Sequence, residues 1–263
     1  MSDTASPIVE MRGISKRYGG VQALTDVDLE LYTDEVHALV GDNAAGKSTL
    51  IKILAGAVAR DAGVVRFQDL PAEIDSPRAA KALGIETVYQ DLALADNLDV
   101  AANMFLGREI VGQGVLRPFL DIRRMEEEAR KVLARLKINI PSIRQKVRSM
   151  SGGQRQSIAI ARSVYFNAKV VILDEPTAAL GVEETRKVHE LVREMRSHGL
   201  AVLMISHNLN HVFENSDRIT VLKTGRVVGT RRVAETSREE ILRMIVTGTA
   251  EGHGQREPKA EAV

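Results

Sequence analysis

The chain has 263 residues, which at about 150 residues per domain predicts one or two domains with a sizeable core. Its 36 Lys and Arg residues balance 35 Asp and Glu residues, and aromatic residues make up only 3%, which argues against a general nucleic-acid binder. The absence of cysteine excludes a disulfide-built secreted domain and thiolate zinc sites. The start of the chain does not resemble a signal peptide, and no aliphatic run approaches the length of about 20 residues that a spanning helix needs.

Patterns typical of strands and helices alternate between two polar ends, 1–7 and 247–263, which we expect to be disordered. Apolar runs or alternation predict strands at 8–16, 27–31, 37–40, 64–67, 85–89, 170–173 and 200–205, the last two buried on both faces. Amphipathic periodicity predicts helices at 48–57, 76–83, 121–137, 154–166 and 237–246. Ser76 and Gly84 are expected to cap the second of these helices, and Ser237 with Glu240 predicts a capping box.

This order predicts an α/β fold with a largely parallel sheet. Residues 218–222 and 227–231, joined at Thr224 and Gly225, predict a hairpin. The stretch 91–164 has helical patterns and few strand signals, so we expect a helical insertion within a single domain that covers 8–246.

Residues 41–48 match the pattern G-x-x-x-x-G-K-[ST] between a predicted strand and a predicted helix. Such a loop directs backbone N–H groups and the helix N-terminus at phosphate oxygens. Lys47 is expected to reach the β- and γ-phosphates, and Ser48 offers a hydroxyl to Mg²⁺. The alternative is a glycine turn with a surface lysine. The predicted ATP-binding residues here are Gly41, Asp42, Asn43, Ala44, Ala45, Gly46, Lys47, Ser48 and Thr49.

Two carboxylates, Asp174 and Glu175, end the apolar strand at 170–173. Ligands of α/β folds bind at the carboxyl ends of strands, so this position favours a functional role over an ordinary strand end. Asp174 is the predicted magnesium partner of Ser48, and Glu175 is the predicted group that polarises the attacking water. A second glycine-rich loop, 151–154, precedes a helix; alone it is a weak signal that also fits a capped turn.

These motifs together resemble the nucleotide-binding subunit of ATP-binding-cassette (ABC) transporters, over residues 8–246. Residues 150–154 are similar to the family signature Leu-Ser-Gly-Gly-Gln, with Met150 for leucine. The resemblance implies a P-loop NTPase core with an antiparallel β-subdomain and an inserted helical subdomain. It also implies a dimer that encloses two ATP molecules, in which the γ-phosphate on one subunit is gripped by the other subunit's Ser151, Gly152, Gly153 and Gln154.

The resemblance identifies three more candidates. Tyr18 matches the aromatic residue that stacks on adenine, Gln90 matches the glutamine that senses Mg²⁺ and water, and His207 matches the switch histidine near the γ-phosphate. His207 and His211 are also spaced like zinc ligands on a helix. The Glu of His-Glu-x-x-His and any cysteine are absent, which disfavours zinc.

The chain departs from the family pattern at two positions. Ala44 replaces the glycine that is usual in the family. Alanine could adopt a positive φ at a cost of roughly 1 kcal/mol, or its methyl group could crowd the β-phosphate. The third alternative is a negative φ, at which alanine is harmless. Gly181 replaces a usual aspartate, which removes a carboxylate from the implied dimer seam.

The resemblance implies an ATPase that drives a separate membrane permease from the cytoplasmic face of the cell membrane. Residues 103–109 and 177–183 resemble monosaccharide importers of the ribose, xylose and fructose type, which implies import of a simple sugar delivered by a periplasmic binding protein. The 17 residues after Val246 are too few for the regulatory domain of maltose-type subunits. The alternatives are an exporter subunit and a soluble cassette protein that acts on ribosomes or DNA.

One apolar segment, 91–107, has two interpretations. It either lines a groove for a permease helix or belongs to the core of the helical insertion. Its apolar residues are Leu92, Leu94, Leu98, Val100, Met104, Phe105 and Leu106.

Overall fold

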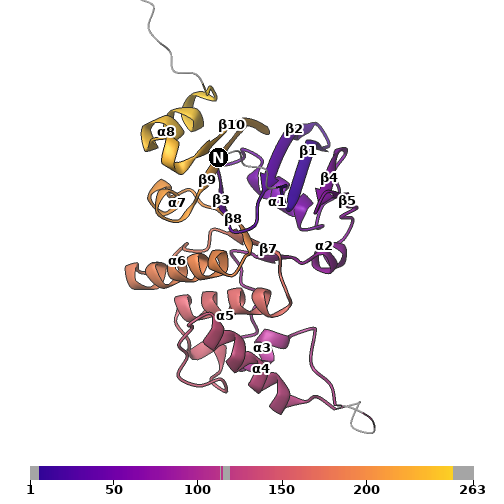
Figure 1. Cartoon of the computed structure of the whole chain (residues 1–263), viewed down its shortest axis with the longest axis vertical. Coiled ribbons are helices and arrows are strands. Elements are labelled where there is room, and N and C mark those ends of the chain that lie inside the picture. The colour runs from indigo at the N-terminus through magenta and orange to yellow at the C-terminus, as the bar shows by residue number, and fades with distance from the viewer. Residues whose placement is uncertain (1–5, 113, 115–118, 251–263) are drawn as a thin grey trace, which may run out of the picture.

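The computed structural model describes residues 6–112, 114 and 119–250 (Figure 1). One sheet has six strands in the order β10-β9-β3-β8-β7-β6. β9, β3, β8, β7 and β6 run parallel, and β10 joins β9 as an antiparallel hairpin, which confirms the largely parallel sheet. These strands are β3 (Val36–Val40), β6 (Ile85–Val88), β7 (Val170–Asp174), β8 (Ala201–Ile205), β9 (Arg218–Lys223) and β10 (Arg226–Arg232).

A second, antiparallel sheet has four strands in the order β2-β1-β4-β5. It lies at the upper right of Figure 1, beside α1. This is the β-subdomain that the resemblance implies. Its strands are β1 (Val9–Tyr18), β2 (Val21–Leu31), β4 (Ala62–Phe67) and β5 (Leu70–Pro71). β2 begins six residues before the predicted strand at 27–31, because pairing with β1 extends it to Val21.

The helices connect the strands and form the insertion, with α3, α4 and α5 gathered at the lower end of the molecule (Figure 1). The first half of the chain holds α1 (Lys47–Leu54), α2 (Pro77–Leu83), α3 (Val100–Phe105) and α4 (Ile122–Arg135). The second half holds α5 (Gly152–Tyr165), α6 (Val182–Ser197), α7 (Leu209–Asn215) and α8 (Arg238–Thr247). Short 3₁₀ turns occur at Val147–Ser149 and Val233–Glu235.

The core has one cluster on each face of the six-stranded sheet, because alternate residues of a strand point to opposite faces. In β8, Val202 and Met204 pack with the helices α3 to α8, whereas Leu203 and Ile205 pack with α1 and the antiparallel sheet. All five residues of β8 are buried, as expected of a strand covered on both faces. The sheet is therefore covered on both faces, and the strand ends hold the residues that follow them in defined positions.

The local predictions are mostly confirmed. Ser76 accepts a hydrogen bond from the Ala79 amide at 3.2 Å, and Gly84 ends α2 with φ 87°. The capping box before α8 is only half formed: Ser237 accepts from the Glu240 amide, but the Glu240 carboxylate binds Arg231 at 2.8 Å instead of returning to Ser237. α6 and α7 were not predicted from the sequence.

The α3 part of segment 91–107 agrees with the core interpretation, and regular structure at the carboxyl end extends one residue further than expected. Val100, Met104 and Phe105 are fully buried, so the apolar residues of α3 form insertion core; Leu106 stays 43% exposed. At the carboxyl end, α8 includes Thr247, so regular structure continues past the predicted boundary at 247. Residues 1–5 and 251–263 of the two predicted tails lie outside the described residues. None of the helices described is both long and apolar enough to cross a bilayer.

Candidate functional site

The loop between β3 and α1 has the conformation expected of a phosphate-binding loop. Gly46 forms the N-cap of α1 with φ 104°, and a Cβ there would lie 2.7 Å from the carbonyl oxygen of Ala23. Only glycine fits this position. The buried Ala45 accepts a hydrogen bond from the Gly225 amide at 2.9 Å, which fastens the loop to the β9–β10 turn. The first part of the loop is open to solvent at Asp42, Asn43 and Ala44, and Gly41 is half-buried.

Lys47 folds back across its own loop. Its Nζ donates hydrogen bonds to the carbonyl oxygens of Gly41 at 2.7 Å and of Asp42 at 2.9 Å. Burial lowers the pKa of Lys47, while the nearby carboxylates Glu175, Asp42 and Asp174 act in the opposite direction. The ammonium group is thus held at the mouth of the loop, and Ser48 and Thr49 follow it in the first turn of α1.

Ala44 has a φ of 64°, in the left-handed region. This excludes the negative-φ alternative for this position: the backbone has the conformation that the family's glycine favours, and alanine adopts it at a cost of about 1–2 kcal/mol. Crowding of the β-phosphate by the methyl group stays a prediction.

The two carboxylates lie where β7 ends, at the same sheet edge as the phosphate loop. Asp174 still pairs with Ile205 of β8, and the Glu175 amide donates to the Ile205 carbonyl at 3.0 Å. Burial, and then the neighbouring charge of Glu175, raise the pKa of Asp174, which leaves a carboxylate that a cation would stabilise. Glu175 has φ 50°, a strained conformation of the kind that clusters at active sites.

His207 lies directly against Glu175. Its Nδ1 is 2.9 Å from Oε1 of Glu175, and the histidine ring is 75% exposed whereas the carboxylate is 18% exposed. Gln90 is exposed two residues beyond Val88, the last residue of β6, which pairs with Leu173 of β7. Gln90 therefore belongs to the same edge of the sheet as Asp174.

Tyr18 lies apart from these groups, at the end of β1. Its ring is 46% exposed, and the Lys16 ammonium lies 5.6 Å from the ring centre. An exposed ring can stack on a base, as the predicted adenine contact requires.

The second glycine-rich loop begins α5. Ser151 and Gln154 form the full capping box: the Ser151 amide donates to Oε1 of Gln154 at 3.1 Å, and the Gln154 amide donates to Oγ of Ser151 at 3.3 Å. A Cβ on Gly153 would lie 2.8 Å from Cβ of Glu184, so glycine allows α5 and α6 to approach closely. A Cβ on Gly152 would likewise meet Leu180 at 2.9 Å.

Glu184 connects this loop with the start of α6. Hydrogen bonds from the Ser151 hydroxyl and from the amides of Gly181 and Gly153 hold the pKa of Glu184 below its ordinary value. The Gly181 amide lies 3.3 Å from its Oε2. Loop 151–154 therefore packs on α6, and the structure does not bring it to the phosphate loop.

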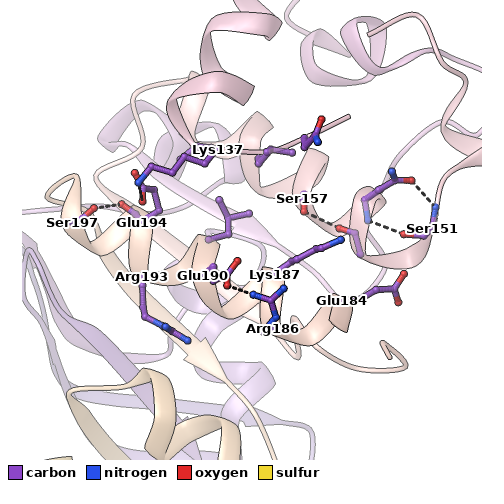
Figure 2. A pocket seen from close by; sticks show the side chains of 16 residues that line it. Lys137, Ser151, Ser157, Glu184, Arg186, Lys187, Glu190, Arg193, Glu194 and Ser197 are labelled. Carbon is purple, nitrogen blue, oxygen red and sulfur yellow. Dashed lines mark hydrogen bonds and ion pairs between the residues drawn. The ribbon is translucent and has the colours of Figure 1, made fainter. Parts of the chain in front are cut away.

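A cavity of about 540 Å³ adjoins the same loop (Figure 2). Its wall is formed by the start of α5, by α6 and by the chain that follows α4. Charged side chains around it pair with one another: Lys137 donates to Glu194 at 2.9 Å, and Arg186 donates to Glu190 at 2.5 Å (Figure 2). The cavity thus lies beside loop 151–154, away from the carboxylates of β7.

Two features of the site had no counterpart in the sequence analysis. One is the strained φ of Glu175. The other is a contact between Thr177 and His211, whose Oγ1 and Nδ1 lie 3.1 Å apart. The rings of His207 and His211, which have the spacing of zinc ligands on a helix, have different partners, Glu175 and Thr177.

A family model described as ABC transporter matches residues 24–178. The chain belongs to the ABC transporter family. Membership makes it an ATPase subunit of the ATP-binding-cassette type, and the matched residues include loop 41–49, loop 151–154, Asp174 and Glu175.

ABC relatives align along most of the chain. It is 46% identical to the xylose/arabinose import ATP-binding protein XylG of Sulfolobus acidocaldarius, over 92% of this chain and 95% of that protein. It is 50% identical to the fructose import ATP-binding protein FrcA of Rhizobium meliloti, over 84% and 86%. The ribose import ATP-binding protein RbsA 1 of Rubrobacter xylanophilus is 45% identical. That alignment spans 91% of this chain but only 47% of the longer relative.

Solved cassette structures have the same fold. The crystal structure of the ADP conformation of an ATP-binding cassette superposes with a TM-score of 0.78 at 26% identity, covering 91% of this chain and 95% of the other. A nucleotide-free cassette gives a TM-score of 0.76 at 25% identity, covering 92% and 95%.

Proposed function

We propose that this ABC ATPase hydrolyses ATP to drive import of a monosaccharide through a separate membrane permease. Relatives named for import of xylose and arabinose, of fructose and of ribose support the substrate class. Because these names differ in the sugar, the proposal extends to a simple sugar and not to one compound. Their shared import function disfavours the exporter and the ribosome- or DNA-acting alternatives.

The observation that supports ATP hydrolysis is the pair of Glu175 and His207, which lie 2.9 Å apart at the sheet edge that also holds Lys47. In the proposed reaction, the amides of loop 41–49 and Lys47 bind the phosphates. Glu175 polarises the attacking water and accepts its proton, and His207 orients the γ-phosphate. Tyr18 stacks on adenine at the margin of this site.

The proposed Mg²⁺ ligands form a set that suits this ion. Ser48, Gln90 and Asp174 offer a hydroxyl, an amide oxygen and a carboxylate, all of them hard oxygen donors. The raised pKa of Asp174 fits as well, because a divalent cation would offset the burial of that charge. Mg²⁺ would neutralise phosphate charge when bound.

Each subunit supplies two half-sites in the proposed assembly. Loop 151–154 lies on α6, separate from loop 41–49, so one chain cannot apply both loops to one nucleotide in this arrangement. A second copy or a related cassette would bring its Ser151, Gly152, Gly153 and Gln154 to the γ-phosphate. The remaining proposed partners are the permease, with this subunit at the cytoplasmic face of the membrane, and a periplasmic sugar-binding protein.

Uptake of labelled sugar tests the function. In cells that lack the gene, uptake of at least one of xylose, arabinose, fructose and ribose should fall, and the wild-type gene should restore it. Glu175→Gln keeps the shape of the side chain but removes the charge, so it should not restore uptake. The purified variant should hydrolyse ATP at least 10²-fold more slowly, on the scale of general-base losses, while it still binds ATP. Unchanged uptake of all these sugars would contradict sugar import, and near-normal hydrolysis by the variant would contradict the role of Glu175.

A further inference from the structure

The segment after β7 and the segment after β8 are joined side chain to side chain at two points. The first is the contact of Glu175 with His207. The second lies two residues further along one segment and four further along the other, where Thr177 Oγ1 and His211 Nδ1 are 3.1 Å apart. Together with the backbone that joins them, the two contacts close a ring that includes Glu175 and His207.

The surroundings of His211 determine which ring nitrogen carries the proton. Oδ1 of Asn208 accepts the amides of Asn210 at 3.0 Å and of His211 at 3.4 Å, as the N-cap of α7. The other end of the Asn208 side chain is therefore its NH₂ group, which donates to Nε2 of His211 at 3.3 Å. We assign the proton to Nδ1, so His211 donates to the hydroxyl of Thr177.

His211 is itself held firmly by α6 and α7. The ring of His189 on α6 packs edge-on against it, with 4.8 Å between ring centres. The carbonyl oxygen of His211 accepts from Nδ2 of Asn215 at 2.8 Å, and Arg193 of α6 donates to Oδ1 of Asn215 at 3.3 Å. His211 thus offers Thr177 a donor whose position is fixed by two helices.

The segment that Thr177 anchors is strained. Glu175 has φ 50° and Ala179 has φ 58°, both unfavourable for residues other than glycine. Such conformations persist only when the surrounding structure holds them. The backbone supplies part of the restraint through the Ala178 amide, which donates to the Glu175 carbonyl at 3.1 Å. The side chain of Thr177, between the two strained residues, supplies a restraint from outside the segment.

We infer that His211 and Thr177 form a positioning pair for the hydrolytic site, a role that rests on the proposed function. The pair holds the strained backbone of Glu175 at a fixed separation from His207, so that the carboxylate stays aligned for the water. In this role Thr177 and His211 act through Glu175 and make no contact with ATP. Loss of their hydrogen bond should therefore slow the chemical step and leave nucleotide binding almost unchanged.

Two nearly isosteric substitutions of Thr177 separate the hydroxyl from the rest of the side chain. Thr177→Val keeps the shape and loses the hydrogen bond, whereas Thr177→Ser keeps the hydroxyl. In steady-state hydrolysis by the purified full chain, Thr177→Val should lower kcat about 3- to 10-fold, as expected from the net contribution of one hydrogen bond. The KM for ATP should change by less than about twofold, since binding is not involved. Thr177→Ser should retain the wild-type kcat.

A second pair of variants covers the case that Thr177→Val does not fold. His211→Asn places an amide near the position of Nδ1 and should retain most of kcat, whereas His211→Leu, of similar size, should lose it. If both single changes fold, the double variant Thr177→Val with His211→Leu should be no slower than the slower single one, because both remove the same bond.

Thermal melting, measured beside kcat, distinguishes a role in positioning Glu175 from a role in fold stability alone. Equal kcat values for Thr177→Val and Thr177→Ser, with only the melting temperature altered, would overturn the inference. A rise in KM that accounts for the whole loss would overturn it too, because it would place the pair in ATP binding. If the wild-type chain hydrolyses no ATP at all, the proposed function fails instead.

Discussion

Ala44 occupies a left-handed backbone position in the phosphate loop, with φ 64°. Alanine adopts this conformation at a cost of about 1–2 kcal/mol, and glycine adopts it freely. Glycine also raises the conformational entropy of the unfolded chain, which offsets about 0.4–1 kcal/mol of the relieved strain. The difference leaves a net stabilisation of about 0–1.6 kcal/mol for Ala44→Gly.

We therefore predict that Ala44→Gly raises the free energy of unfolding by up to about 1.6 kcal/mol in urea titrations. Any strain that increases when ATP binds should appear in calorimetry as tighter binding, by at most about fivefold, since 1.4 kcal/mol corresponds to tenfold. Ala45→Gly is the control: Ala45 is buried and has no positive φ, so the same change should destabilise the protein. If Ala44→Gly destabilised the chain as much as the control, Ala44 would not be strained.

The two strained residues of the site differ in how far the sequence reveals them. A positive φ at Ala44 could be anticipated, because the family resemblance implies glycine at this position. Glu175 has φ 50° although glutamate has no preference for that region, so nothing in the residue type indicated it. The contact of Thr177 with His211 was equally hidden, because it joins side chains 34 positions apart through the tertiary fold.

Among the secondary-structure elements, the buried strands were the most predictable. β7 and β8 are covered on both faces, so their sequences are continuous apolar runs with one interpretation. α6 was missed although its buried residues Val188, Leu191, Val192 and Met195 have helical spacing. α7 has only seven residues and two buried ones, which leaves too little periodicity to detect.

The N-terminus of α6 depends on Glu184, which we predict to stabilise the packing of α5 on α6. Glu184→Gln should lower the melting temperature at neutral pH by a few degrees, because the charged carboxylate accepts hydrogen bonds from Ser151, Gly181 and Gly153. The control is Glu183→Gln in the same turn. Glu183 contacts only the exposed Arg186 in the described structure, at 3.2 Å, so its loss should have little effect.

The pH dependence of the Glu184 effect has a definite sign. The folded-state pKa of Glu184 is lowered, so its stabilisation is fully present above the unfolded-state value near 4.3 and is lost as the pH falls through the folded-state pKa. The difference in melting temperature between wild type and Glu184→Gln should therefore shrink as the pH is lowered below about 4. A difference that stays constant over this range would show that the charge of Glu184 is not what stabilises the junction.

At the scale of the whole molecule, the fold followed from the order of strand and helix patterns together with the motifs. The roles of the individual site residues remain predictions, since they depend on nucleotide and on a second subunit. Loop 151–154 packs on α6 through Gly153 and Glu184. This packing disfavours a rearrangement that would bring the loop to Lys47 of the same chain.

Mixed dimers test the shared site directly. Lys47→Ala removes the phosphate contact of one half-site, and Ser151→Arg blocks the other half-site, so each variant alone should be inactive. A mixed dimer contains one intact site, formed by Lys47 of the Ser151→Arg chain and Ser151 of the Lys47→Ala chain. If half of the dimers in an equal mixture are mixed and the sites act independently, ATP hydrolysis should recover to about one quarter of the wild-type rate.

The matched control mixes Lys47→Ala with Glu175→Gln. Both changes damage the same half-site, so neither site of the mixed dimer is intact and activity should not recover. Equal recovery in the two mixtures would contradict a site shared between subunits, as would full activity of either single variant sedimenting as a monomer. Recovery in neither mixture would contradict independent sites. Recovery confined to the first mixture, with its rate set by the fraction of mixed dimers, is the result that the separation of Lys47 from loop 151–154 predicts.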